Sequence, residues 1–392
     1  MPNRETPSKP LSPAEFDRLM APFDVPSAAH VAVAVSGGAD SLALALLLAD
    51  WARARGAQTL GTQVTALTVD HALRTGSDVE ALKVGAWLSA LGINHSILTW
   101  KDGGALSSGV QAGIQARARD ARYALMAGWC RTHGVKQLFV AHHLGDQAET
   151  FVMRLRRAST LFGLAAMAPM RQIHGINVCR PFLEVTKARL EATLRGRHQA
   201  WVEDPSNANP AFERVRTRAL IQRLGVEGVT PARLAGAAGA AGRVTKILDR
   251  AAAAFETMAV TSHAGGGFHM EGGAFQALPQ VVRERVLSQL LNRVGGQVYA
   301  PSPAKLERLA RWMTSADGAG GTARTLGGCV VRRGDGGYSI VPEPPRKHVP
   351  QAKKARFFAS APLSRPAKRL TSQAHTGVHG GACDGAQAHP KC

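Results

Sequence analysis

The sequence predicts an α/β protein: a Rossmann-like parallel sheet with helices on both faces, followed by a helical domain and a small α+β C-terminal region. Three observations predict it. Short β-branched, apolar runs alternate with longer Ala- and Leu-rich runs over the first 156 residues. The short runs are continuously apolar, which is typical of strands buried on both faces. A turn containing serine and glycine joins the first strand to the first long helix.

The elements follow one another in a regular order. Strands are expected over residues 30–35, 64–69, 93–100 and 137–141, and helices over residues 41–55, 78–91, 110–133 and 146–156. Residues 159–182 are expected to be loop-rich. Further along, the composition predicts an Ala-rich helix over 231–259, two amphipathic helices within 280–314 and a β-hairpin region over 322–342.

Length and composition exclude several classes of protein. The 392 residues, 45% of them hydrophobic, are enough for two or three domains with cores of their own. No run of 18 apolar residues predicts a membrane span, and the polar first ten residues lack the apolar stretch of a secretory signal. The five cysteines form no CxxC pair, so neither a disulfide framework nor a metal cluster is expected. We expect a cytoplasmic protein without a membrane partner.

Net charge points to a polyanionic partner. The chain has 48 Lys and Arg against 28 Asp and Glu, a formal charge of +20. Residues 344–392 hold nine Lys and Arg and one Asp, which leaves +12 on the rest of the chain. A charge of this sign favours encounter with nucleic acid. The low aromatic content, 5%, argues against a binder that works by base stacking alone.

The segment SGGADS, residues 36–41, is the strongest local signal for chemistry. Gly37 and Gly38 allow the backbone to approach an anion closely, and the helix that follows presents its free N–H groups to that anion. Ser36 and Ser41 add hydroxyl donors. Asp40 beside phosphates fits a Mg²⁺ ligand, although a helix cap would also explain it. The segment is neither a Walker A motif nor a GxGxxG fingerprint.

Polar residues also follow two other predicted strands. Asp70, His71 and Arg74 come after the second strand, and His143 and Asp146 after the fourth. Ligands bind at the carboxyl ends of parallel strands, so these groups are expected beside the SGGADS loop. Adjacent His142 and His143 point in different directions and lack zinc-ligand spacing, which argues against zinc.

The loop resembles the pyrophosphate loop of the N-type ATP pyrophosphatases. An ordered series of further segments resembles the tRNA(Ile)-lysidine synthases over residues 30–220: VDHALR, ARDARY, AHHLGDQAET, GLAAM, RPFL, WVEDPSN and FERVRTR. The block TLGGCVVRR adds a weaker match. The chain departs from this family's pattern at Gly145, where an Asp is usual, at Ala158, where a Gly is usual, and at Val215, where an Asn is usual.

The resemblance implies a reaction and a set of residues. ATP would adenylate the C2 oxygen of the wobble cytidine of tRNA(Ile) with a CAU anticodon, and free L-lysine would displace AMP. Mg²⁺ would be held by Asp40 and Asp146, and the catalytic residues would be Asp40, Asp146 and Arg119. ATP would be bound by Ser36, Gly37, Gly38, Ala39, Asp40, Ser41, Asp70 and His71. Arg119 and Arg122 would clamp phosphate or stabilise the activated base with their guanidinium donors. A homodimer is left open.

Composition along the chain and the resemblance together predict a domain organisation. Residues 1–29 would form a mobile N-terminal arm and residues 30–220 the ATP-binding catalytic domain. Residues 221–315 would form a helical tRNA-binding domain, 316–343 a small β region and 344–392 a disordered basic tail.

Three alternatives remain. A tRNA thiolase of the same superfamily would generally carry cysteine pairs, which this chain lacks. A GMP or asparagine synthetase would need a glutaminase domain, and position 2 here is Pro2 rather than a nucleophilic cysteine. An inactive tRNA-binding relic would account for Gly145 and Val215, but has no reason to keep the loop of residues 36–41.

Overall fold

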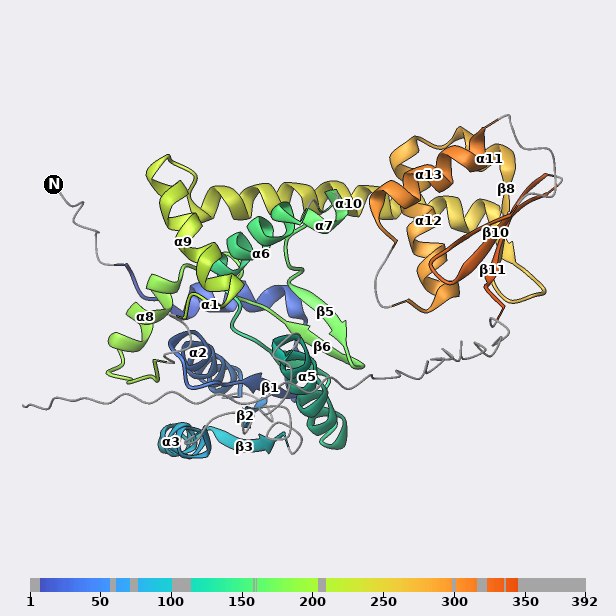
Figure 1. Ribbon diagram of the computed structural model, residues 1–392. Helices are drawn as coiled ribbons and strands as arrows, with labels where there is room; N and C mark the ends of the chain where they lie inside the picture. Colours follow the sequence, from blue (N-terminus) through green and yellow to red (C-terminus); the bar gives the residue numbers. More distant parts are fainter. Residues whose placement is uncertain are drawn as a thin grey trace, which may run out of the picture. The chain divides into compact units, whose positions relative to one another are not determined.

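The computed structural model describes residues 8–56, 61–70, 77–100, 114–157, 159, 161–203, 209–297, 301–315, 323–334 and 336–344. A six-stranded sheet has the order β3-β2-β1-β4-β6-β5 (Figure 1). Neighbouring strands are parallel except β5 and β6, which are antiparallel. The strands are β1 (His30–Ala34), β2 (Gln63–Asp70), β3 (Asn94–Thr99), β4 (Gln137–Phe139), β5 (Met170–Ile173) and β6 (Ile176–Cys179).

Helices cover both faces of this sheet, which confirms the predicted fold class. Alternate residues of β1 enter two different cores: Val31 and Val33 pack with one set of helices, and Ala32 with another. The first core takes in helices α1, α2, α3 and α8, and the second takes in α5. Their bounds are α1 (Pro13–Met20), α2 (Ala39–Gly56), α3 (Ser77–Ala90), α5 (Ile114–Thr132) and α8 (Lys187–Arg195).

The N-terminal segment is part of the first core, which corrects the expectation of a mobile arm over its described residues. Phe16 is 1% exposed and stacks edge-on against Phe182, and Phe23 meets Phe139 in the same way. Helix α1 begins with a capping box of Ser12 and Glu15, and a short 3₁₀ turn, Ala21–Phe23, follows it. Burial of these aromatic rings holds the segment on the sheet.

Residues 170–179 differ from expectation, because the stretch read as loop-rich contains the hairpin β5–β6. Its two-residue turn is His174–Gly175, and both residues have positive φ, 48° and 81°. This is the backbone of a tight hairpin turn. The hairpin adds one antiparallel strand, β5, to the edge of the predicted parallel sheet.

Helix α6 (Leu144–Arg156) follows β4 and is fastened to the chain segment after it. The buried Gln147 side chain donates to the Met167 carbonyl (3.1 Å) and accepts from the Met167 amide (2.7 Å). Arg154 donates to the Ala165 carbonyl. The short helix α7 (Leu161–Leu164) lies within this connection, and the Ala166 amide donates to the Ala238 carbonyl of the long helix α10 (Pro231–Ala259).

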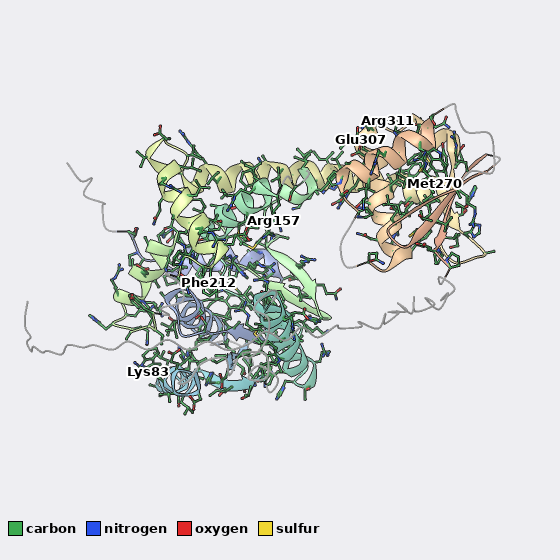
Figure 2. All side chains as sticks on the ribbon, in the orientation of Figure 1. Lys83, Arg157, Phe212, Met270, Glu307 and Arg311 are labelled. Carbon is green, nitrogen blue, oxygen red and sulfur yellow. The ribbon has the colours of Figure 1, made fainter. Side chains whose placement is uncertain are left out.

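A second, antiparallel sheet has the order β7-β8-β11-β10-β9. Helix α9 (Glu213–Val226) precedes α10, and α11 (Gly272–Ala277), α12 (Gln280–Gly295) and α13 (Pro303–Thr314) pack with this sheet. Its strands are β7 (Val260–Ser262), β8 (Phe268–Glu271), β9 (Ala323–Leu326), β10 (Cys329–Gly334) and β11 (Gly337–Pro342). Met270, labelled in Figure 2, is fully buried in its core, whereas Glu307 and Arg311 pair on the surface of α13.

Within the described ranges, none of the helices is both long enough and apolar enough to cross a membrane. The basic tail of residues 345–392 lies outside the described residues. The division of the chain into domains at residues 29, 220, 315 and 343 stays a prediction.

Candidate active site

The SGGADS loop lies between β1 and α2, at the carboxyl edge of the first sheet. Ser41 holds it together: its hydroxyl accepts the Ser36 amide (3.1 Å) and donates to the Gly38 carbonyl (3.0 Å). The Ser36 and Ser41 hydroxyl oxygens are 3.3 Å apart. Ser36 is exposed while Ala39 and Ser41 are buried, so the loop opens to solvent on one side. This is the geometry of an anion-binding helix N-terminus.

Gly37 is required by the loop's backbone. Its φ is +85°, and an added Cβ would lie 2.7 Å from Val84 Cγ2 of α3. Its carbonyl accepts the Val202 amide (2.9 Å), so a segment far along the chain closes over the loop. Gly38 is less constrained, since its nearest side-chain contact would be 3.7 Å away.

A histidine joins the two carboxylates that the sequence singled out. His143 begins α6: its Nδ1 accepts the Gly145 amide (2.9 Å), and its own amide donates to Asp146 Oδ2 (3.0 Å). Since Nδ1 accepts, a neutral ring carries its proton on Nε2. That atom lies 3.8 Å from Asp40 Oδ2 and 3.8 Å from Asp146 Oδ2. Asp40, His143 and Asp146 therefore form one cluster, here called the acid–His cluster.

The two carboxylates of the acid–His cluster differ in acidity. Burial raises the pKa of Asp40 above its ordinary value, although His143 and Lys187 act against the shift. Burial also acts to raise the pKa of Asp146, but His143, His142, Arg214 and the His143 amide outweigh it and hold that pKa below its ordinary value. Asp146 is thus the more firmly ionised of the two.

Gly145 gives a physical reason for one departure from the family pattern. An added Cβ at this position would lie 2.7 Å from the His143 ring, and the Gly145 amide donates to that ring. A larger side chain here would displace the imidazole as it lies in this structure.

A second layer of charges lies behind Asp146. Arg214 of α9 lies 3.9 Å from Asp146 Oδ1 and 3.7 Å from Glu149 Oε2. Arg218 donates to Glu149 Oε1 at 2.9 Å. Glu149 is only 3% exposed, so this pairing compensates a buried carboxylate and ties α9 to α6.

Basic and aromatic groups flank the acid–His cluster on the side of β6. The Arg119 and Arg122 guanidinium groups lie 5.4 and 5.5 Å from the Tyr123 ring centroid on α5. Arg180 follows β6, is 5% exposed and donates to the Ala168 carbonyl (2.9 Å). Burial lowers the pKa of His142 to about 3, so this imidazole is neutral near pH 7 and does not act as a cation.

Not every predicted site residue can be placed. Asp70 ends β2 at the same carboxyl edge, and its carbonyl accepts the Trp100 amide. His71, Arg74 and Ala158 lie outside the described residues. Arg119 is exposed on α5, near enough to His142 to lower its pKa. Sequence reasoning missed Lys187, which acts on Asp40 only through the fold, and gave no role to Val202, although it lies in the segment WVEDPSN.

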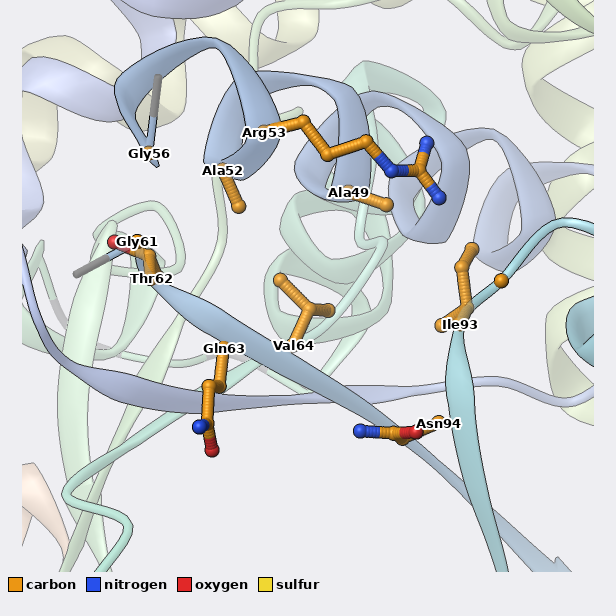
Figure 3. Close-up of a pocket in the computed structure, with 11 residues that line it drawn as sticks. Ala49, Ala52, Arg53, Gly56, Gly61, Thr62, Gln63, Val64, Ile93 and Asn94 are labelled. Atoms are coloured by element: carbon orange, nitrogen blue, oxygen red, sulfur yellow. The ribbon is translucent and has the colours of Figure 1, made fainter. Parts of the chain in front are cut away.

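A separate cavity of about 560 Å³ lies at the opposite edge of the sheet (Figure 3). It is lined by Ala49 and Arg53 of α2 and by the first residues of β2 and β3, Gln63 and Asn94. Because these are the amino ends of the strands, the cavity is distinct from the acid–His cluster.

Comparison with known proteins decides the family. A family model described as a PP-loop domain matches residues 11–224. The chain is 40% identical over 355 residues to a tRNA(Ile)-lysidine synthase of Bradyrhizobium sp. strain BTAi1, covering 86% of this chain and 96% of the relative. The chain belongs to the tRNA(Ile)-lysidine synthase family. Members of this family from Methylobacterium nodulans and Rhodopseudomonas palustris are 38% and 37% identical, and the chain covers 98% and 96% of their lengths.

A solved structure shares the fold of this family member. The U34-tRNA thiolase NcsA from Methanococcus maripaludis, solved with its 4Fe-4S cluster, superposes with a TM-score of 0.50 at 14% identity, covering 60% of this chain and 78% of the thiolase. Membership of the tRNA(Ile)-lysidine synthase family, with its PP-loop domain, makes this chain an ATP-using enzyme with a tRNA substrate.

Proposed function

We propose that this member of the lysidine synthase family joins free L-lysine to C2 of the wobble cytidine of tRNA(Ile) bearing a CAU anticodon. The C2 oxygen attacks the α-phosphorus of ATP and diphosphate leaves. The lysine ε-amine then attacks C2, the C2–N bond forms, the C2–O bond breaks, and AMP leaves with the oxygen. The modified wobble base would change the codon specificity of the tRNA from AUG to AUA. The observation that carries the proposal is the acid–His cluster beside the SGGADS loop.

The loop would hold ATP by its phosphates. Ser36, Gly37, Gly38, Ala39 and Ser41 surround the N-terminus of α2, where backbone N–H groups favour negative charge. Asp70 and His71 follow β2 on the same edge and would contribute to the nucleotide site. Release of diphosphate leaves negative charge at this point, which the helix N-terminus stabilises.

The residues present fit a magnesium ion. Asp40 Oδ1 is buried and has no hydrogen-bond partner among the described residues, as expected of an oxygen reserved for a cation. Within the described part of the chain, no three or more acidic, His or Cys side chains gather into a closed metal cage. Mg²⁺ is typically held by one or two carboxylates together with substrate phosphates, so Asp40 and Asp146 would hold it. Bound there, it would offset charge on the departing diphosphate.

Asp146 would also receive the lysine. Its carboxylate stays ionised because its pKa is low, so it attracts an ammonium group. A low pKa makes a weak base, so the role favoured here is binding and orienting the amine rather than accepting its proton. Arg119 would stabilise the adenylated base from the exposed side of α5 with its fork of donors.

The tRNA would be gripped by basic residues beyond the catalytic sheet. The candidates lie on α9 and α10, and they are Arg214, Arg216, Arg218, Arg223, Arg233, Arg243, Lys246 and Arg250. Arg214 and Arg218 are also engaged with Asp146 and Glu149, so they join this surface to the active site. With a tRNA substrate, the enzyme would act in the cytoplasm.

One assay tests the proposal. Purified protein is incubated with ATP, Mg²⁺, radiolabelled lysine and tRNA(Ile) with a CAU anticodon, beside Asp40→Ala and Asp146→Asn variants. We expect label in the tRNA, AMP in equal amount and loss of both by at least 100-fold in each variant, about 3 kcal/mol of transition-state stabilisation. Label that appears equally in the variants would refute the roles of the two carboxylates. AMP release that depends on tRNA and a sulfur donor would indicate a thiolase instead.

A further inference from the structure

Five arginines on neighbouring elements of the first sheet influence one another electrostatically. They come from α5, α6, β5 and the end of β6, and are here called the arginine row: Arg119, Arg122, Arg154, Arg171 and Arg180. Among the described residues, no carboxylate lies within 4.0 Å of any of them. Elsewhere on the molecule, arginines pair regularly with carboxylates, for example Arg157 with Glu213 and Arg197 with Asp50.

The arginine row is held in place by backbone contacts. The Arg180 amide donates to the Pro169 carbonyl (2.7 Å), and its guanidinium donates to Ala168. Arg154 donates to Ala165 in the same segment. Arg171 stands in β5 opposite Val178, two residues before Arg180. The segment after α7 thus fixes two of the five guanidinium groups, those of Arg154 and Arg180, and Arg171 follows it in β5.

These cations destabilise one another as the structure stands. Burial lowers the pKa of Arg122, Arg154 and Arg180. Tyr123 acts against the shift at Arg122 and Arg180, but neighbouring arginines add to it: Arg119 at Arg122, Arg171 at Arg154, and Arg119 and Arg171 at Arg180. The Nε atoms of Arg122 and Arg180 are buried without a hydrogen-bond partner in the described residues. Neighbouring arginines without a carboxylate partner are stabilised when an anion binds between them.

The arginine row is accessible and longer than a single phosphate site. Arg119 and Arg171 are exposed, as is Met170 beside them. β5 is the last strand at its edge of the sheet, three strands from β1 and the SGGADS loop. At a strand spacing of about 4.8 Å, Arg171 stands on the order of 14 Å from the loop strand. A nucleotide bound at the loop leaves this end of the row free for a second, extended anion.

We propose that the arginine row binds the phosphodiester backbone of the tRNA next to the base that enters the active site. The inference rests on the proposed function and deepens it by naming the surface that leads the anticodon to the acid–His cluster. Arginine side chains on phosphates fix the register of a bound strand, whereas the acid–His cluster acts on the base. Arg171 is a positioning residue in this scheme, because it is remote from the reacting atoms.

The test uses the full chain and an exposed member of the row outside the catalytic set. The dissociation constant for fluorescently labelled tRNA(Ile) is measured against salt for wild type, Arg171→Ala and Arg171→Lys. Arg18→Ala is the matched control, since Arg18 is an exposed arginine on α1 that bonds only the carbonyl of Ala14. Steady-state KM for ATP, lysine and tRNA and kcat are measured on the same proteins.

We expect Arg171→Ala to weaken tRNA binding about fivefold and to lower the slope of log K against log salt by about 0.7–0.9. Its KM for ATP and lysine and its kcat at saturating tRNA stay within twofold of wild type, and Arg171→Lys restores most of the binding. An affinity and salt slope equal to those of Arg18→Ala would overturn the inference.

The two proposals fail in different ways. If wild type labels tRNA but Arg171→Ala binds it like the control, only the arginine row is refuted. If wild type binds tRNA without labelling it, and Arg171→Ala still weakens that binding, the reaction is refuted and the row is supported. A wild-type protein that neither binds nor labels tRNA would overturn both.

Discussion

At the residue scale, the active site depends on a few side chains whose roles follow from their surroundings. The pattern SGGADS predicted a phosphate loop, and the structure gives the reason for its first glycine, a positive φ and a close approach to Val84. His143 was expected beside this loop, because it follows a parallel strand. Its contact with Asp146 is a local helix cap, whereas its approach to Asp40 depends on how β4 and α2 meet, which no local pattern encodes.

Gly37→Ala should damage both folding and nucleotide binding. The new Cβ forces an L-residue to positive φ, about 1–2 kcal/mol, and collides with Val84 Cγ2 at 2.7 Å. We expect a lower unfolding free energy by roughly 2 kcal/mol or more and ATP binding weakened more than tenfold. Urea unfolding and a titration with an ATP analogue check these.

Gly38→Ala is the control for that experiment, because its Cβ would meet no side chain closer than 3.7 Å. It should unfold within about 1 kcal/mol of wild type. Equal destabilisation by the two substitutions would contradict the role given to the backbone of Gly37.

At the element scale, the sequence predicted helices better than it predicted the edge strands of the sheet. The bounds of α10 agree with the expected range, 231–259, because Thr230 caps the helix and a proline follows the cap. The hairpin β5–β6 was missed, since its strands have only four residues each and β5 is largely exposed. An exposed edge strand lacks the continuous apolar run on which the prediction relied.

Helix α1 should make folding depend on pH through Glu15. The Ser12 amide, Arg189 and the Ser12 hydroxyl hold the pKa of Glu15 at about 2, against an ordinary 4.5. A pKa depressed by folding gives stability that is complete above about pH 4.5 and is lost as pH falls toward 2. We expect Glu15→Gln to unfold at a lower temperature than wild type at pH 7, with the difference shrinking below pH 4.5.

Thermal unfolding of both proteins between pH 7 and pH 3.5 measures this effect. Asp17→Asn serves as a comparison on the same helix, because Asp17 bonds the Trp51 ring nitrogen rather than a cap. A difference between wild type and Glu15→Gln that stays constant across the range would refute the assignment.

At the scale of the whole molecule, the strands of the second sheet come from two segments that are far apart in the sequence. The second sheet combines β7 and β8 with β9–β11, which lie beyond α11, α12 and α13. Ile340 of β11 pairs with Phe268 across 72 residues of chain. Such pairing is set by tertiary contacts, so hydropathy alone identified only the hairpin of residues 322–342.

The described cysteines should be inert in the native protein, unlike those of a thiolase. Cys130, Cys179 and Cys329 are fully buried, and burial raises the pKa of the first two to about 12 and of the third to about 11. Thiolates are the reactive form, so alkylation at pH 8 should leave all three unmodified until the protein is denatured.

Mass spectrometry after iodoacetamide treatment, with and without guanidinium, measures the modification of each thiol. Cys130→Ala should also retain lysine transfer to tRNA within about threefold, provided it folds, because the thiol has no chemical role. Rapid native alkylation of Cys130 or Cys179 would favour sulfur chemistry.

The amide of Gln147 uses both its donor and its acceptor on a single residue, Met167. No other natural side chain of that length offers both groups at neutral pH. Glutamate has no N–H donor, lysine has no acceptor, and methionine has no donor. In a saturation library scored for growth or activity, position 147 should therefore tolerate almost no substitution, although it contacts no substrate group in the scheme above. Positions that are intolerant for this reason would be mistaken for catalytic ones in such a map.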